Sequence, residues 1–122
     1  MDVVFLGANN AGFAIYDWLC EQTDVTVHAL LTTPDQLSLI EEVEPELVVA
    51  TGFDHVVPPE VLAVPDRGCL NVNPGLLPYT RGYNPNVWSI VEDLPAGVTI
   101  HWMDEGIDTG DILVRRFGPI AP

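Results

Sequence analysis

The sequence predicts an α/β fold in which a mostly parallel sheet carries helices on both faces. Short apolar runs alternate along the chain with segments of helical periodicity, and the early runs have no polar face. Such runs are typical of parallel strands, which are buried on both sides. With 122 residues the chain can bury about two-thirds of its unfolded surface, so we expect a single domain over residues 1–122.

The first predicted unit is a strand followed by a helix. The apolar run DVVFLG at 2–7 ends in glycine, and the segment NNAGFAIYDWLCEQ after it has Asn9 or Asn10 as a candidate N-cap. One face of this helix would carry the apolar residues Ala11, Ala14, Ile15, Trp18 and Leu19.

The alternation continues along the rest of the chain. We expect strands at 24–31, 46–53 and 68–74, a short helix that starts at a proline at 34–45, and one helical turn in VPPEVLAVP. Beyond them, NPNVWSIVED predicts a helix with Asn84 as N-cap, and GVTIHWMDEG and DILVRRFG predict two further strands.

Polar residues collect in the loops that follow three of these strands, GFDHVVPP, NVNPGLLPYTRGYNP and MDEGIDTGD. Ligands of open α/β sheets bind beyond the carboxyl ends of the strands, so we expect these loops to meet over one edge. The earlier loop GANNAG matches neither a dinucleotide fingerprint nor a P-loop, and tight turning explains its glycines.

The charge balance argues against some classes of partner. Eighteen acids stand against four arginines and no lysine, which gives a formal net charge of −14. This field repels nucleic acid and anionic membranes, so we expect neither as a partner. A solvated surface adapted to high salt, and hence a halophilic source, is favoured over an acidic recognition surface. The acidic start MDVVFLG lacks the basic region of a secretory signal, and we expect a cytoplasmic protein.

The two cysteines give no sign of a metal or disulfide site. Cys20 and Cys69 lie far apart in the sequence, without C-x-x-C spacing, and each sits in an apolar pattern. We therefore expect two core thiols and no metal.

Two asparagines stand near the end of the fourth predicted strand. Asn71 and Asn73 are two positions apart, so both side chains lie on the same face of an extended strand. Two amide donors facing a cleft could stabilise an oxyanion on a carbonyl under attack, and Asp108 in IDTG adds an ionisable group. The sequence fits equally well with amides that only bond the loop backbone beyond them.

The segment from Gly52 to Ile112 resembles the formyltransferases that use 10-formyltetrahydrofolate. It contains close counterparts of the family motifs N-x-H-P-S-L-L-P with a following Arg-Gly, G-V-T-x-H and D-x-G-x-D-T-G. The stretch LLPYTRGYNPNVWSI is most similar to the sugar N-formyltransferases, which act on nucleotide-linked amino sugars. The resemblance implies a Rossmann-like fold, 10-formyltetrahydrofolate as co-substrate and a small-molecule acceptor.

The resemblance also implies roles for individual residues. Asn71 matches the asparagine that helps to hold the tetrahedral intermediate, and Asp108 matches the aspartate that positions the catalytic water. The walls that receive the pterin would include Phe53, Asp54, His55, Val57, Asp104, Gly106 and Ile107. The loop facing the acceptor amine would include Tyr79, Arg81 and Asn84.

Asn73 departs from the family pattern, because it stands where the family has its catalytic histidine. An amide can donate to an oxyanion but cannot accept the proton that the attacking amine loses, which typically costs about 10²–10⁴ in rate. His55 and His101 are candidates to compensate, although ordinary wall residues are the more conservative interpretation. Two hypotheses follow: a minimal N-formyltransferase, or a noncatalytic folate- or sugar-binding module.

A second departure is the short segment between the second and third predicted strands, as though one strand-helix unit were missing. A trimmed sheet exposes edges that can pair with a second copy, so we expect a homodimer. A partner subunit for a longer homologue is the residual alternative.

Overall fold

The computed structural model describes residues 1–73, 99–103 and 112–115 of the chain. All six predicted strands are present, and β1, β2 and β3 are shorter than predicted. The predicted helix NPNVWSIVED lies outside the described residues. The elements are β1 (Asp2–Leu6), α1 (Asn10–Cys20), β2 (Thr26–Leu31), the 3₁₀ helix η1 (Pro34–Leu37), α2 (Ser38–Val43), β3 (Leu47–Ala50), α3 (Pro59–Leu62), β4 (Cys69–Asn73), β5 (Thr99–Trp102) and β6 (Ile112–Arg115).

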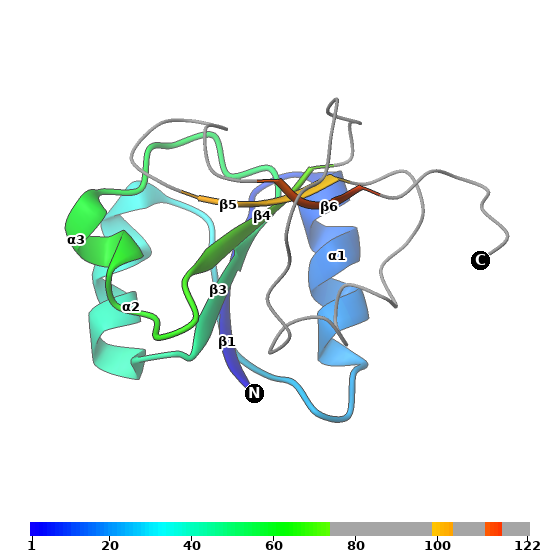
Figure 1. Ribbon diagram of the computed structural model, residues 1–122, viewed down its shortest axis with the longest axis horizontal. Helices are drawn as coiled ribbons and strands as arrows, with labels where there is room; N and C mark the ends of the chain where they lie inside the picture. Colours follow the sequence, from blue (N-terminus) through cyan, green and yellow to red (C-terminus); the bar gives the residue numbers. More distant parts are fainter. Residues whose placement is uncertain (74–98, 104–111, 116–122) are drawn as a thin grey trace, which may run out of the picture.

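The strands form one sheet in the order β2-β1-β3-β4-β5-β6. Strands β2, β1, β3 and β4 are parallel to one another. Strand β5 is antiparallel to β4, and β6 is antiparallel to β5. Helix α1 covers one face of the sheet, and η1, α2 and α3 cover the other (Figure 1). The predicted mostly parallel sheet with helices on both faces is confirmed.

Two hydrophobic cores lie on the two faces of the sheet, and alternate residues of each inner strand belong to different cores. The α1-side core contains Val3, Phe5, Ile15, Leu19, Val25, Leu47, Val49, Leu70, Val72 and Ile100. The α3-side core contains Val4, Leu6, Leu31, Leu37, Ile40, Val48, Ala50, Val57, Val61 and Cys69. Because β1 and β3 contribute to both cores, their sequences have no polar face.

Helix α1 begins as predicted, and three residues of its predicted apolar face, Ile15, Trp18 and Leu19, pack in or against the α1-side core. The side chain of its N-cap, Asn9, accepts a 2.8 Å hydrogen bond from the backbone N–H of Gly12. The buried residues are Gly12, Ile15 and Leu19. The prediction that Ala11 and Ala14 belong to this face was wrong, because close packing at Gly12 turns both alanines towards solvent.

The loop between β1 and α1 packs directly on the residues that follow β3. A methyl group on Gly12 would stand 2.4 Å from the carbonyl oxygen of Thr51, and one on Gly7 would stand 2.7 Å from the same oxygen. Neither glycine has a positive φ, so close approach rather than tight turning explains them. The two loops are in contact at the point where strand order reverses, a common ligand crevice in doubly wound sheets.

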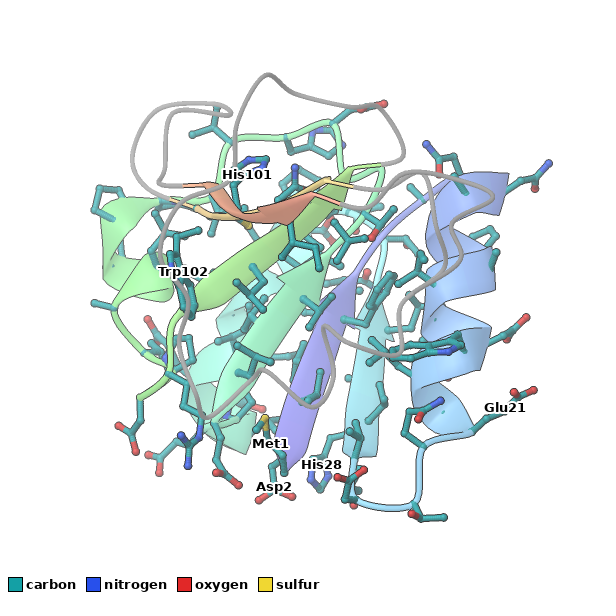
Figure 2. All side chains as sticks on the ribbon, turned by 45° about the vertical axis from the view of Figure 1, so that its right-hand side comes forward. Met1, Asp2, Glu21, His28, His101 and Trp102 are labelled. Carbon is teal, nitrogen blue, oxygen red and sulfur yellow. The ribbon has the colours of Figure 1, made fainter. Side chains whose placement is uncertain are left out.

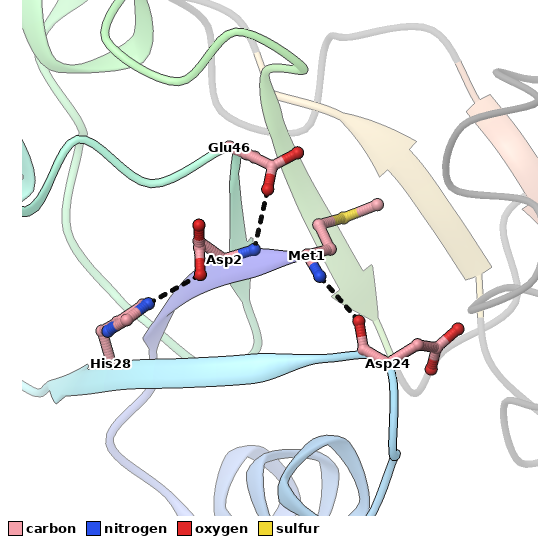
Figure 3. Close-up of polar contacts among 5 residues, drawn as sticks. All are labelled: Met1, Asp2, Asp24, His28 and Glu46. Atoms are coloured by element: carbon pink, nitrogen blue, oxygen red, sulfur yellow. Dashed lines mark hydrogen bonds and ion pairs between the residues drawn. The ribbon is translucent and has the colours of Figure 1, made fainter.

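The amino ends of β1, β2 and β3 are joined by polar contacts (Figure 3). The Met1 ammonium donates to the Asp24 carbonyl at 2.6 Å, and the Asp2 backbone N–H donates to Glu46 Oε1 at 3.2 Å. His28 Nε2 lies 2.9 Å from Asp2 Oδ1, and this hydrogen bond lowers the pKa of Asp2 below its usual value. These charges lie at the edge opposite to the predicted site. No helix in the described part of the chain is long and apolar enough to cross a membrane.

Substitution of Gly52 by alanine should destabilise the fold more than substitution of Gly68. Both glycines have positive φ, +69° and +94°, which costs alanine about 1–2 kcal/mol at either position. At Gly52 the methyl group would also stand 2.4 Å from the Asn9 amide, whose displacement would remove the α1 cap and about 1 kcal/mol more. At Gly68 the nearest atom belongs to the Trp102 ring at 3.1 Å.

Urea unfolding of both variants beside the wild type measures the difference. Equal losses for Gly52→Ala and Gly68→Ala would contradict the proposed packing of the two loops.

Candidate functional site

Asn71 lies at the centre of the mixed sheet. Its neighbours across the strands are Ala50, the last residue of β3, and His101 of β5. Asn71 shares its face of β4 with Cys69, a member of the α3-side core. The predicted oxyanion donor is therefore half-buried, beside the carboxyl end of β3 and on the face covered by α2 and α3.

His101 contacts Asn71 directly. The two residues are opposite one another in the antiparallel β4–β5 pair, and Asn71 Nδ2 lies 3.5 Å from His101 Nε2. Only 1% of the His101 surface is exposed. Figure 2 places His101 at the end of the sheet opposite to Met1, Asp2 and His28. A buried imidazole thus stands against the amide that the sequence singles out.

The segment after β3, whose last residue Ala50 lies opposite Asn71, carries two aromatic rings in contact. Phe53 packs on the α3-side core, and its ring meets that of His55 edge-on, with 5.2 Å between the ring centroids. Val57 is buried in the same core, whereas Asp54 and His55 are exposed. Since β3 ends opposite Asn71, this predicted pterin wall begins beside the amide.

One geometric expectation was wrong. The loop after β5 was expected to leave the sheet at the same edge as the loops after β3 and β4. Instead β5 is antiparallel, so it ends beside the start of β4, where the Met103 N–H donates to the Cys69 carbonyl at 2.8 Å. The segment after Met103 therefore begins at the opposite end of β4 from Asn73. Sequence periodicity predicts a strand but not its direction.

Alternation within GVTIHWMDEG predicts that His101 and Met103 share one face of the strand, opposite Ile100 and Trp102, and the structure confirms this. Met103 packs against the α3-side core, whereas Ile100 and Trp102 belong to the α1-side core. His101 lies between them on the face of Asn71, as its position in the sequence requires.

The other predicted site residues are placed only in part. The backbone of Asn73 ends β4 and pairs with Thr99. Seven predicted site residues lie outside the described part of the chain: Tyr79, Arg81, Asn84, Asp104, Gly106, Ile107 and Asp108.

The two cysteines differ in environment. Cys69 is buried, and desolvation raises the pKa of its thiol to about 12. Cys20 is exposed, so its prediction as a core thiol was wrong: it ends α1 on the side turned away from Ile15 and Leu19. Both are free thiols. Among the described residues, no three His, Cys, Asp or Glu side chains are grouped to hold a metal ion.

A surface hollow of about 360 Å³ lies away from this site. Its lining residues are Glu41, Glu44, Pro45, Val64 and Asp66. These residues precede β3 and β4 or belong to α2, so the hollow opens at the amino ends of the strands. Its acidic lining would repel an anionic ligand.

Comparison with known proteins identifies the family. The model of the family described as formyl transferase matches residues 8–122. The chain belongs to this formyl transferase family. The match begins well before Gly52, where the recognisable motifs start, and it confirms the resemblance drawn from those motifs.

The curated relatives are longer proteins. A methionyl-tRNA formyltransferase from Syntrophus aciditrophicus (strain SB) is 44% identical over 90 residues, which cover 73% of this chain and 29% of the relative. A methionyl-tRNA formyltransferase from Geobacter sulfurreducens (strain ATCC 51573 / DSM 12127 / PCA) is 36% identical over 107 residues, which cover 85% of this chain and 34% of the relative. The chain thus spans about a third of the length of these relatives.

Solved structures of family members share the fold. A sugar N-formyltransferase from Shewanella sp FDAARGOS_354 has a TM-score of 0.62 and 28% identity, over 99% of this chain and 58% of that one. The formyltransferase PseJ from Anoxybacillus kamchatkensis was solved with UDP-4,6-dideoxy-4-formamido-L-AltNAc and tetrahydrofolate. It has a TM-score of 0.57 and 26% identity, over 95% of this chain and 59% of that one. The predicted Rossmann-like α/β fold is confirmed.

The contact between Asn71 and His101 was not predicted. The sequence signal was the G-V-T-x-H motif together with alternation, which gave the face of His101 within its own strand. Its partner depends on the antiparallel register of β4 and β5, whose strands are separated by 25 residues outside the described part of the chain.

In the folded protein, one of the two thiols should react rapidly with a thiol reagent. Cys20 is exposed, whereas Cys69 is buried and its raised pKa keeps it protonated. Titration with Ellman's reagent at pH 8 should count one thiol under native conditions and two in denaturant.

Cys20→Ser serves as the control, because it should leave no fast-reacting thiol. Rapid native reaction of Cys69 in that variant would contradict the burial of β4.

Proposed function

We propose that this chain acts as an N-formyltransferase, moving a formyl group from 10-formyltetrahydrofolate to the amino group of a small acceptor. The observation that carries the proposal is Asn71, which lies half-buried beside the carboxyl end of β3 in a chain of the formyl transferase family. An amide there can donate a hydrogen bond to a carbonyl oxygen that becomes negatively charged.

The segment after β3 is suited to hold the folate. Phe53 and His55 provide two aromatic rings at 5.2 Å, and Val57 anchors the segment in the α3-side core. Flat heteroaromatic rings such as a pterin pack favourably on aromatic side chains. The segment starts beside Asn71, so a folate bound there would lie close to the amide.

The proposed reaction is an acyl transfer. The acceptor amine forms a bond to the formyl carbon, and negative charge develops on the formyl oxygen while the amine loses a proton. The bond from carbon to the folate N10 then breaks, and N10 takes up a proton. We propose that Asn71 and Asn73 donate hydrogen bonds to the oxyanion and that Asp108 orients the water that carries the proton.

For the acceptor we propose a nucleotide-linked amino sugar. The LLPYTRGYNPNVWSI stretch is most similar to sugar N-formyltransferases, and two solved structures with this fold are a sugar N-formyltransferase and an enzyme solved with a UDP-linked formamido sugar. The methionyl-tRNA formyltransferases among the relatives make charged tRNA the competing acceptor. A net charge of −14 disfavours binding to a nucleic-acid backbone.

A second candidate function is supported by Asn73. This residue replaces the family's catalytic histidine and cannot shuttle a proton near neutral pH. A module that binds folate or sugar without turnover is the alternative. In either case a homodimer formed through a sheet edge remains a prediction, since β2 and β6 are the outer strands of the described sheet.

Asn71→Ala should abolish most formyl transfer, lowering kcat by about 10²–10³, because an oxyanion donor is lost. Release of tetrahydrofolate, followed by absorbance with amino-sugar nucleotides and with charged tRNA as separate acceptors, measures the effect. Gln22→Ala is the matched control. It also removes a side-chain amide, one that donates to the Trp18 carbonyl at the far end of α1, and it should leave kcat unchanged.

Activity of Asn71→Ala equal to that of the wild type would contradict the proposed oxyanion site.

Asn73→His should raise the rate by about 10²–10⁴ if proton transfer limits the reaction, because it restores a titratable group. The same assay over pH 6 to 8 measures the change. Turnover in the wild type that the histidine merely accelerates supports the enzyme, whereas turnover only in the variant favours the binding module.

Phe53→Ala should weaken the binding of 5-formyltetrahydrofolate, a stable analogue, by about tenfold, because one stacking surface is removed. Isothermal titration calorimetry in high salt measures the dissociation constant. Val56→Ala is the control, since Val56 is 57% exposed and next to His55 in the same segment.

Equal affinities of the two variants for 5-formyltetrahydrofolate would show that the Phe53 ring does not contact the folate. No binding of any folate derivative to the wild type would contradict both candidate functions.

A further inference from the structure

We propose that His101 is a positioning residue that fixes the direction in which the Asn71 amide points. The inference rests on the proposed function and adds to it a residue that acts through Asn71 rather than on the substrate. It is carried by the cross-strand contact between the two side chains and by the burial of the imidazole.

The contact is built into the sheet. Asn71 and His101 are directly opposite in the β4–β5 ladder, so their Cβ atoms lie on the same face. With 1% of its surface exposed, the His101 ring has little freedom to change rotamer. Asn71 Nδ2 and His101 Nε2 are 3.5 Å apart, a long hydrogen bond of the kind that shortens when a substrate closes a site.

The direction of the amide decides what Asn71 can do. A carboxamide has a donating end and an accepting end of nearly the same shape, and it can rotate by half a turn. With its oxygen turned to the formyl oxygen, Asn71 would repel the developing charge. A neutral imidazole whose Nε2 carries no proton accepts a hydrogen from Nδ2. This contact distinguishes the donating end of the amide from its accepting end and so fixes the orientation of Asn71.

This role matters more in this chain than in a relative with a histidine at position 73. Since Asn73 cannot shuttle a proton, stabilisation of the oxyanion must supply a larger share of the rate. Electrostatic stabilisation is effective when the donor is already oriented before the reaction begins. His101 provides that orientation from the sheet, while the proton is carried by other groups.

His101→Phe and His101→Gln test the proposal in the full chain. Phenylalanine fills the space without an acceptor, whereas the glutamine oxygen can accept from Nδ2. His101→Phe should lower kcat by about tenfold or more, with both KM values within about twofold, and His101→Gln should retain kcat within about threefold. His28→Phe, at the opposite end of the sheet, is the matched control and should keep kcat.

Melting temperatures of all variants separate this effect from a loss of structure. Undiminished kcat in His101→Phe overturns the proposal. So does a loss in His101→Gln as large as that in His101→Phe when both are folded.

The imidazole tautomer gives a readout that needs no turnover. Long-range ¹H–¹⁵N spectra of the three histidines, with His101 assigned by its variants, should show a proton on Nδ1 and none on Nε2. The Asn71 side-chain amide protons should exchange more slowly in the wild type than in His101→Phe. A proton on Nε2 overturns the positioning role. Absence of turnover together with the expected tautomer would contradict the proposed function and leave the positioning of Asn71 supported.

Discussion

The burial of β1 and β3 on both faces is the constraint on which the rest of the structure depends. Residues 3–6 of β1 and all of β3 alternate between the α1-side and α3-side cores, so a polar side chain at any of these positions would be desolvated. Polar chemistry is therefore displaced to the loops and to β4, the next strand along the sheet. Asn71 can stand on β4 because it has a polar neighbour, His101, on the following strand.

The change of direction between β4 and β5 creates this polar pair. Parallel strands β1, β3 and β4 bring their carboxyl ends to one edge, and the antiparallel β5 then sets His101 opposite Asn71. The contact of the loop at Gly7–Gly12 with Thr51 and Gly52 brings the first two loops together at the reversal of strand order. The candidate site accordingly lies one strand further on, between the end of β3 and the β4–β5 pair.

Membership of the formyl transferase family explains the fold of this chain, whereas the proposed activity depends on individual site residues. The family match covers residues 8–122 and agrees with the observed fold. Under the proposed function, Asn73 stands where the family resemblance places a catalytic histidine, and an amide cannot shuttle a proton near neutral pH. The chain thus has the fold of its family, and the proposed site combines the Asn71 amide with an asparagine at position 73.

The sequence by itself determined the strands, the two-sided cover of the sheet and the family, since apolar runs, alternation and local motifs are properties of neighbouring residues. It placed His101 and Met103 on one face of β5 and Asn9 at the cap of α1 for the same reason. The tertiary structure alone decided three things. These are the direction of β5, the exposure of Ala11 and Ala14 on α1, and the pairing of Asn71 with His101. The exposure of the two alanines follows from the close contact at Gly12. Each depends on a contact between segments distant in the chain, and periodicity within one segment carries no information about the register or direction of its partner.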